Sequence, residues 1–427
     1  MPDLFDYRPA PLWFLNHKLE KEEIKRQIGL MKNCGVSGFF MHPRAGLLTQ
    51  YGSEEWFDII KYIVELAEEA GLKAWLYDED PFPSGIAGGW VVFDNPGYAA
   101  RSVRVKKLLP DENGRVVSSL GRGRLLSVIA LKTDSSGNIS EFMELTGAVG
   151  IIRPKFFKTP FDCAYFAVMI DEKKYEHVRA ETSYPELHID VELEGPEWAV
   201  YVSIDDIIRV GDQSGVFPDN LSRECVRSFL NFTHEKYNKT LGGRFGNSIP
   251  GIFTDEAVPG GWTPGFAELF EKEKGYKIES NFHHFVDTFG PESRKIRQDY
   301  WSVLHGMFKE NFFGQISSWC RQHSLKLTGH VWGEDDPLNH VFAGGNAFAY
   351  QKYFDIPGFD IVGTNLGDRI YPGLNFGGKL ISSAAHQQGK RQVISECFGG
   401  NPFNFGMDGM MKFAGWLFSL GITWLSP

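Results

Sequence analysis

Three segments of the sequence repeat one order of elements, in which a charged amphipathic helix is followed by a glycine and then by an apolar strand. The helix predicted over 20–34 stops at Gly35, that over 53–70 at Gly71, and that over 407–420 at Gly421. Glycine ends a helix readily because it accepts the left-handed backbone conformation. Helix, glycine and strand in this repeated order are typical of parallel βα units.

Eight segments of the chain qualify as strands of such units. They are residues 11–16, 36–43, 72–80, 249–257, 325–334, 358–363, 391–398 and 421–427. Eight βα units predict an α/β fold of the (β/α)8, or TIM-barrel, type. The alternative is an open doubly wound sheet, but no GxGxxG turn follows the first strand to favour it.

Residues 101–215 interrupt this pattern. Short apolar stretches there alternate with turn clusters such as PDENG and TDSSGN, which is typical of antiparallel strands. We therefore expect barrel strands one to three over 1–100, an antiparallel β insertion after strand three over 101–215, and barrel strands four to eight over 216–427. The chain stops at the eighth strand, so we expect further C-terminal domains in the native protein.

Composition narrows the classes of partner. The net charge of −10, from 44 basic and 54 acidic side chains without a basic run, argues against nucleic acid. No stretch approaches about 18 unbroken apolar residues, and the N-terminus lacks a signal-peptide pattern, so we expect a cytoplasmic protein without a membrane partner. Five cysteines without CxxC spacing fit a reducing compartment.

Polar side chains follow most of the predicted strands, and in a (β/α)8 barrel the chemistry lies at those C-terminal strand ends. Two acids from different strands can flank one glycosidic bond, one as general acid and the other as base or nucleophile. We predict Glu256 and Glu396 as this catalytic pair, the alternative being acids ion-paired at the rim. The predicted substrate-binding residues are Asn16, His42, Arg44, Asp78, Glu79, Asp255, His330, Trp332 and Glu334.

Some of these positions carry a specific expectation. Alternation along the strand IFTDEA is expected to send Asp255 and Glu256 to opposite sides, with Glu256 in the cleft and Asp255 directed away. His42 and His330 are predicted to be hydrogen-bonded rim residues rather than proton shuttles. Trp332 is a candidate platform for a sugar ring, with core packing as the alternative.

The motifs GFFMHPRAGL, PGIFTDEA, GHVWGE and VISECFGG, in this order, resemble the catalytic barrel of glycoside hydrolases related to the family 106 α-L-rhamnosidases. More distantly, the chain is similar to the clan A glycosidases. The resemblance implies that Glu256, at the end of strand four, is the acid, and that Glu396, at the end of strand seven, is the base or nucleophile. Clan A barrels commonly carry Asn-Glu on strand four, where this chain has Asp255-Glu256.

The resemblance also implies an inverting reaction and a calcium ion near the sugar, with Asp78, Glu79 and Glu334 as candidate ligands. No other cofactor is expected for the chemistry. The predicted function is hydrolysis of an O-glycosyl bond in a poly- or oligosaccharide, with an α-L-rhamnoside as the candidate substrate. Two alternatives stay open: a carbohydrate-binding barrel without catalysis, and a metal-dependent hydrolase or lyase.

Overall fold

The computed structural model of the protein describes most of the chain. The described residues are 7–80, 82–153, 186–208, 217–334, 337, 340–341, 345–361, 374–401 and 404–427.

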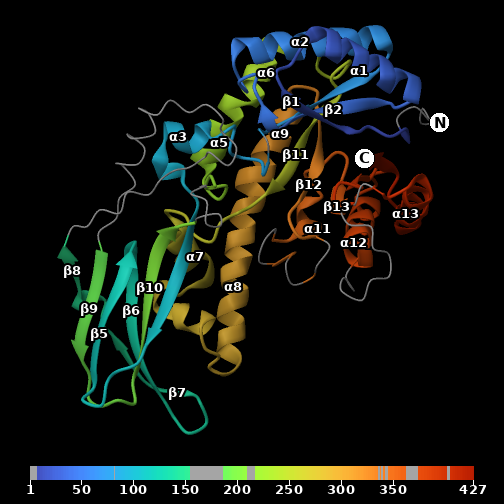
Figure 1. Ribbon diagram of the computed structural model, residues 1–427. Coiled ribbons are helices and arrows are strands. Elements are labelled where there is room, and N and C mark those ends of the chain that lie inside the picture. Colours follow the sequence, from blue (N-terminus) through green and yellow to red (C-terminus); the bar gives the residue numbers. More distant parts are fainter. Residues whose placement is uncertain are drawn as a thin grey trace.

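All eight predicted strands are present, and they are divided between two parallel sheets (Figure 1). The five-stranded sheet has the order β1 (Leu12–His17), β2 (Gly38–Leu47), β3 (Lys73–Tyr77), β11 (Gly251–Ala257) and β12 (Lys326–Val331). The three-stranded sheet has the order β13 (Gly358–Ile361), β14 (Ile394–Cys397) and β15 (Trp424–Ser426).

Helices connect these strands and cover their outer faces. They are α1 (Lys21–Cys34), α2 (Glu54–Ala70), α3 (Trp90–Asp94), α5 (Arg223–Phe232), α6 (His234–Leu241), α7 (Phe266–Lys274), α8 (Gly290–Phe308), α9 (Gln315–Gln322), α11 (Ala347–Tyr350), α12 (Leu374–Gln387) and α13 (Met407–Leu420). Shorter turns are the 3₁₀ segments η2 (Pro96–Tyr98), η3 (Thr146–Ala148), η5 (Gly242–Arg244) and η6 (Glu279–Phe285), and the π-helical η7 (Lys309–Gly314).

The helix boundaries follow the capping rules that the sequence indicated. The Ser53 hydroxyl accepts a hydrogen bond from the Trp56 amide at the start of α2, and Gly71 closes that helix in the left-handed conformation. Gly35 and Gly421 close α1 and α13 in the same way. Each helix therefore turns back promptly into the next parallel strand.

Isolated backbone hydrogen bonds link the two sheets at both of their outer edges. Next to β1, the amide of Ala10 donates to the carbonyl of Leu425 at 3.0 Å. Beside β12, the amide of Ile356 donates to the carbonyl of Leu327 at 3.2 Å. Because β13, β14 and β15 have only 4, 4 and 3 residues, these links do not extend into full ladders. The described strands thus form an α/β arrangement in two sheets, and the predicted closed barrel is not confirmed.

One buried cluster draws side chains from both sheets. The rings of Phe40, Trp75 and Trp424 lie 5.2–5.7 Å apart, centroid to centroid. Phe253 and Ile394 complete this contact between the sheets, whereas alternate residues such as Phe39 and Ile252 pack outward against the helices. The two sheets therefore share an interior, with the helices on the other side.

The interruption after β3 is antiparallel, as predicted, and forms two sheets. Their strands are β4 (Arg101–Leu108), β10 (Ala199–Ile207), β6 (Arg124–Thr133) and β7 (Ile139–Glu144) in one, and β5 (Arg115–Arg122), β9 (Glu186–Glu192) and β8 (Val149–Arg153) in the other. The apolar stretches that predict strands are 101–109, 115–120, 125–132, 161–170 and 187–195. Four of them overlap β4, β5, β6 and β9, the stretch 161–170 lies outside the described residues, and β7, β8 and β10 were not predicted. In Figure 1 these strands lie to one side of α8, opposite α12 and α13.

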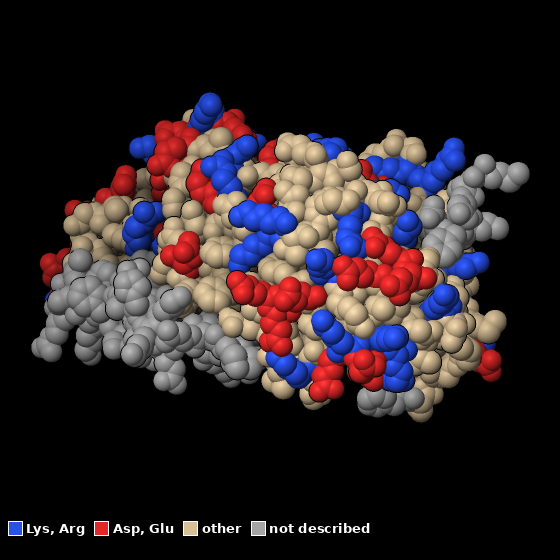
Figure 2. All heavy atoms as spheres, turned by 90° about the horizontal axis from the view of Figure 1, so that it is seen from above, with Lys and Arg blue, Asp and Glu red and all other residues tan. Residues whose placement is uncertain are grey.

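The surface shows little segregation of charge where it can be seen. In the view from above, basic and acidic side chains are interspersed, with no continuous basic strip on that face (Figure 2). Within the described residues, no helix combines the length and the apolar character that crossing a bilayer requires.

Candidate active site

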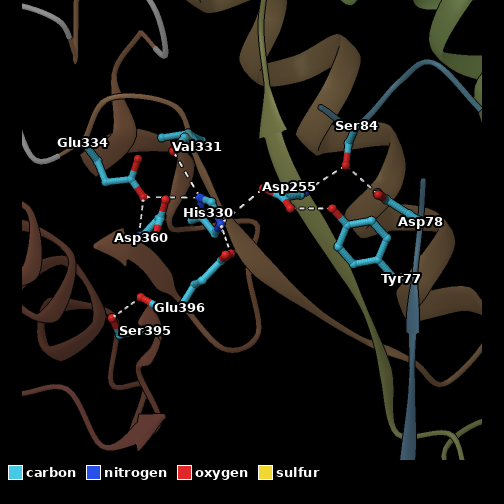
Figure 3. A network of polar contacts seen from close by, with 10 residues as sticks. All are labelled: Tyr77, Asp78, Ser84, Asp255, His330, Val331, Glu334, Asp360, Ser395 and Glu396. Carbon is cyan, nitrogen blue, oxygen red and sulfur yellow. Dashed lines mark hydrogen bonds and ion pairs between the residues drawn. The ribbon is translucent and has the colours of Figure 1, made fainter. Parts of the chain in front are cut away.

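The ends of β11, β12, β13 and β14 bring acidic side chains together around one histidine (Figure 3). We call this set the His330 cluster. Its members are His330 itself and the acids Asp255, Glu256, Glu334, Asp360 and Glu396. Parallel neighbours place their carboxyl ends at the same edge, and Asp360 and Glu396 are paired directly across β13 and β14.

The imidazole of His330 is buried and contacts acids through both ring nitrogens. Its Nε2 lies 3.0 Å from Oε2 of Glu396 and 3.3 Å from Oδ1 of Asp255, while Nδ1 lies 3.6 Å from Oε1 of Glu334. Burial alone would lower the pKa of His330. The charge of Asp255, the hydrogen bond with Glu396 and the charge of Glu334 overcome this effect and raise that pKa well above 6.5. His330 is therefore the cation of the cluster near neutral pH.

The single positive charge of His330 does not neutralise all the acidic groups around it. Burial raises the pKa of Asp255 to about 7, against the attraction of His330. Burial likewise raises the pKa of Glu334 to about 8. The pKa of Asp360 is raised by burial and then by the charge of Glu396. The cluster thus holds protons that isolated carboxyls would release, as groups in acid–base sites do.

A chain of contacts extends from Asp255 toward β2. The hydroxyl of Tyr77 donates a hydrogen bond to Oδ2 of Asp255. The ring of Tyr77 stacks on His42 with a centroid separation of 3.8 Å and an interplanar angle of 17°. Burial, and then the charge of Arg44, lower the pKa of His42 to about 3, so His42 is a neutral packing partner at physiological pH.

The prediction that Asp255 points away from Glu256 is wrong. Asp255 reaches His330 directly, and a carboxylate oxygen of Glu256 lies within 4.8 Å of both a His330 ring nitrogen and an Asp360 oxygen. Strict alternation fails here because Glu256 has a φ of +45° and the register with β12 shifts between Thr254 and Ala257. A non-glycine residue in this left-handed region stores strain, which is frequent at functional sites.

Two predicted acids after β3 have structural partners. The two carboxylate oxygens of Glu79 together accept five hydrogen bonds. The donors are the backbone amides of residues 80, 85, 86, 87 and 88. Asp78 accepts from the hydroxyl of Ser84 at 2.5 Å, and that hydroxyl also accepts from the amide of Asp255 at 2.7 Å. Glu79 therefore shapes the 79–88 loop, and Asp78 links that loop to β11. Contact of either with substrate stays a prediction.

The remaining predicted residues surround this set without joining it. Asn16 is exposed at the end of β1, and no described hydrogen bond or ion pair connects it to the His330 cluster. The guanidinium of Arg44 lies 4.9 Å from the ring centroids of Phe14 and Phe82. Trp332 follows β12 with 38% of its surface exposed, so it is not a core residue. Its exposed ring leaves the sugar-platform prediction open.

The sequence analysis missed Asp360, Tyr77 and Ser84. Asp360 ends β13 within the motif GFDIVG, and the rule applied to the other strand ends would have found it. The sequence indicates a core role for Tyr77, because it is the last residue of the apolar run KAWLY. Its contact with the site is made by the hydroxyl, which donates to Asp255. Ser84 offered no comparable signal.

The cluster contains donor atoms that suit a cation. Asp255, His330 and Glu396 form one set of donor atoms within 4.8 Å of one another, and Glu256, His330 and Asp360 form another. Calcium takes oxygen ligands, so the carboxylates suit it and the imidazole does not. Oδ1 of Asp360 is buried and has no hydrogen-bond partner among the described residues. Asp360 therefore has a carboxylate oxygen that could meet calcium, Oε1 of Glu334 already accepts from the Asp360 amide, and Glu79 does not fit because both of its oxygens are occupied.

Comparison with known proteins gives one family. Residues 210–424 match the glycoside hydrolase 106 family, described as alpha-L-rhamnosidase. This range contains every member of the His330 cluster. No curated protein has a matching sequence.

The fold is similar to that of a solved rhamnosidase. The structure of a rhamnosidase from Novosphingobium sp. PP1Y aligns with 100% of the chain at 15% identity and a TM-score of 0.64. The chain spans only 55% of that structure's length. The PgaB (BpsB) glycoside hydrolase domain from Bordetella bronchiseptica aligns with 98% of the chain and 94% of its own length, at 11% identity and a TM-score of 0.43. That score is too low to support an argument.

Proposed function

The chain belongs to the glycoside hydrolase 106 family of alpha-L-rhamnosidases, and on that premise we propose that it hydrolyses the bond between an α-L-rhamnosyl unit and the rest of an oligo- or polysaccharide. One observation carries the proposal. Acids from four strand ends converge on His330, and Glu396 and Glu256 belong to this same cluster. Glycoside hydrolysis commonly uses two carboxyl groups that flank one bond, and the presence of both glutamates in one cluster supports these roles for them.

We assign Glu396 as the general base. Its Oε2 lies 3.0 Å from Nε2 of His330, and this hydrogen bond holds the carboxyl group in one orientation. Its side chain is 18% exposed, so water can reach it. A carboxylate held in one orientation and open to water can take a proton from an attacking water molecule.

We assign Glu256 as the general acid. It ends β11 on a strained backbone and is half-buried, so its carboxyl group lies at the edge of the cluster rather than in the core. The neighbouring Asp255 is buried and is held by Tyr77 and His330. In this scheme Glu256 protonates the glycosidic oxygen while Glu396 activates water on the opposite face of the sugar.

This division of roles gives inversion at the anomeric carbon, because water attacks directly from the face opposite the leaving group. Proton NMR of the first product formed distinguishes the outcomes, since an inverting enzyme releases β-L-rhamnose from an α-L-rhamnoside. Initial release of α-L-rhamnose would instead mean a covalent intermediate on the second carboxylate.

Calcium is proposed to bind at this site. Asp360, whose Oδ1 has no hydrogen-bond partner among the described residues, would hold it together with Glu334, which accepts from the Asp360 amide at 2.9 Å. A bound calcium ion supplies positive charge and open positions for hydroxyl oxygens. The roles of Glu396 and Glu256 stated above do not depend on it.

The complete (β/α)8 barrel is also a proposal. The backbone hydrogen bonds at both edges of the two sheets and their shared interior support it. Closure would place the ends of β1 and β2, with Asn16 and Arg44, on the rim that carries the His330 cluster.

The function is tested with p-nitrophenyl α-L-rhamnopyranoside and the variants Glu256→Gln and Glu396→Gln. Each substitution keeps the shape and removes the titratable proton, so turnover should fall by about 100-fold or more. Glu69→Gln, an exposed acid on α2, is the matched control. Near-parental rates in both cluster variants contradict the assignment, and sugar binding by a parent protein without turnover favours a non-catalytic carbohydrate-binding role.

A further inference from the structure

A positively charged side chain stands at the same end of the five-stranded sheet as the His330 cluster. It is Arg44, which is part of β2. In that sheet β3 separates β2 from β11. With a spacing of about 4.8 Å between neighbouring strands, β2 lies roughly 10 Å from the strand that carries Asp255 and Glu256. Arg44 is therefore outside the cluster, at a distance that a neighbouring unit of an oligosaccharide can span.

Arg44 is on the face of the sheet that carries the site. Along β2, Phe40 packs in the interior that the two sheets share, and His42 and Arg44 follow it at every second position. Residues two apart in a strand lie on the same face. On β3 the same face carries Tyr77, whose ring stacks on His42 and whose hydroxyl donates to Asp255. A row of contacts therefore leads along this face from His42, beside Arg44, to the His330 cluster.

Two aromatic rings contact the guanidinium of Arg44. Its Cζ lies 4.9 Å from the ring centroid of Phe14 on β1 and 4.9 Å from that of Phe82. The ring of Phe14 also meets that of His42 edge to face, with a centroid separation of 5.1 Å. This contact confirms that Arg44 and His42 share one face of the sheet. A cation is attracted to the π faces of such rings, and this attraction positions the guanidinium without a hydrogen-bond acceptor.

The N–H groups of Arg44 are open to a ligand. Among the described residues, Arg44 forms neither a hydrogen bond nor an ion pair. Its side chain is half-buried, and none of its nitrogens is among the buried atoms that lack a partner, so solvent reaches them. A guanidinium is permanently charged and offers five N–H donors in a planar fork, which matches the two oxygens of a carboxylate. Arg44 is therefore a positioned cation whose donors meet no acceptor in the described part of the chain.

The charge around the site favours a negatively charged ligand for Arg44. The acids of the His330 cluster outnumber its one cation, so the cluster repels a sugar that carries a carboxylate. A positive charge beside the cluster offsets this repulsion for the sugar unit that it contacts. An uncharged sugar needs no such compensation, and its hydroxyl groups gain less from a guanidinium than a carboxylate does.

We propose that Arg44 binds the carboxylate of a uronic acid unit next to the rhamnosyl unit, so that the substrate is an acidic oligo- or polysaccharide. The inference rests on the proposed function for the rhamnosyl bond and adds the class of the neighbouring sugar. The fork of Arg44 donates to both carboxylate oxygens, and the ring of Phe14, which is 46% exposed, meets the apolar face of the same sugar. Arg44 determines specificity and takes no part in proton transfer.

The test compares two disaccharides that differ in one carboxyl group, 4-O-α-L-rhamnopyranosyl-D-glucuronate and 4-O-α-L-rhamnopyranosyl-D-glucose. The kcat/KM of the parent should be at least about tenfold higher for the glucuronate, and in Arg44→Gln the ratio of the two values should fall at least about tenfold. Arg227→Gln removes the same charge from an exposed position on α5 and should keep the parental ratio. A merely structural Arg44 would lower both values together, and the unchanged ratio would overturn the proposal.

Arg44→Lys gives a second variant should Arg44→Gln disturb folding. It keeps the charge and removes the planar fork, so its ratio should lie between those of the parent and Arg44→Gln. Added sodium chloride screens the charge and should lower the preference of the parent for the glucuronate. A parental ratio near one, or equal ratios in the parent and Arg44→Lys at every salt concentration, overturns the proposal.

Binding measurements separate this proposal from the proposed function. The dissociation constants of both disaccharides are measured by calorimetry in the Glu396→Gln background, so that the result does not depend on turnover. Binding of the glucuronate that is at least about tenfold tighter, and that is lost when Arg44→Gln is added, supports the proposal even if the assigned hydrolysis fails. Equal binding of the two disaccharides, with hydrolysis of p-nitrophenyl α-L-rhamnopyranoside by the parent, overturns this proposal and leaves the proposed function intact.

Discussion

Nε2 of His330 lies 3.0 Å from Oε2 of Glu396, and this contact joins the end of β12 in the larger sheet to β14 in the smaller one. The two residues are 66 positions apart in the chain. The same nitrogen lies 3.3 Å from Asp255 on β11, so one imidazole positions acids from both sheets. A single buried cation therefore positions the proposed base and the residue next to the proposed acid.

Replacing that cation should damage both activity and stability. His330→Gln keeps an amide near Glu396 but leaves several buried carboxylates without their positive partner, which typically costs about 3 kcal/mol or more. We expect the unfolding free energy in urea to fall by about this amount, and kcat to fall at least about tenfold. His386→Gln changes an exposed histidine on α12 and should change neither. Parental kcat in His330→Gln would contradict a positioning role.

Tyr77→Phe tests the orientation of Asp255. The substitution keeps the ring that stacks on His42 and removes the hydrogen bond to Oδ2 of Asp255. We expect a loss of about 1–3 kcal/mol in unfolding free energy and a lower kcat at nearly unchanged KM. Tyr276→Phe also removes a tyrosine–aspartate hydrogen bond, that to Asp299, but outside the site. If both variants lose the same activity, Tyr77 has no special role.

Glu79→Gln tests the structural role of the buried acid in the 79–88 loop. An amide can no longer accept on both sides, so some of the five backbone donors lose their partner. We expect a lower thermal midpoint, equivalent to a loss of about 1–3 kcal/mol in unfolding free energy. We also expect the amides of residues 85–88 to lose protection and to exchange rapidly with solvent. The exposed Glu69→Gln should exchange like the parent, and unchanged protection in Glu79→Gln would argue against this role.

The raised pKa of Glu334 predicts how the unfolding free energy depends on pH. Burial raises its pKa from 4.5 to about 8, so between these values the folded protein holds a proton that the unfolded chain releases. This contribution to stability is full below pH 4.5 and is lost as the pH rises through about 8. Relative to Glu334→Gln, the parent should therefore lose unfolding free energy between pH 4.5 and 8. Urea titrations of both proteins across this range measure the difference, and a constant or rising difference contradicts the shift.

Calcium should stabilise the folded protein if Glu334 and Asp360 hold it. A ligand that binds only the native state raises the thermal midpoint in proportion to the logarithm of its concentration. We expect calcium to raise the midpoint, EGTA to reverse the rise, and Asp360→Asn to abolish it. Asp408→Asn, an exposed acid on α13, should respond like the parent. An equal response in Asp360→Asn would place any calcium elsewhere.

Much of the fold could be predicted because its signals are local. The helix ends at Gly35 and Gly71 and the apolar strands after them depend on neighbouring residues alone, and they lie where the sequence analysis put them. The split of the strands into two sheets could not be predicted in this way. It depends on whether short strands distant in sequence form full ladders, and at Leu327 and Leu425 only isolated hydrogen bonds form.

The sequence by itself determined which acids end the strands, and therefore that Glu256, Glu334 and Glu396 share one edge of the fold. Only the tertiary structure decided how they face one another. A left-handed φ at Glu256 and a shifted register on β11 turn Asp255 and Glu256 into the same cluster, against simple alternation. The structure also added Asp360 and the hydroxyl of Tyr77. The reason is physical: side-chain direction and pKa arise from burial and from charges on distant strands, which a local pattern does not contain.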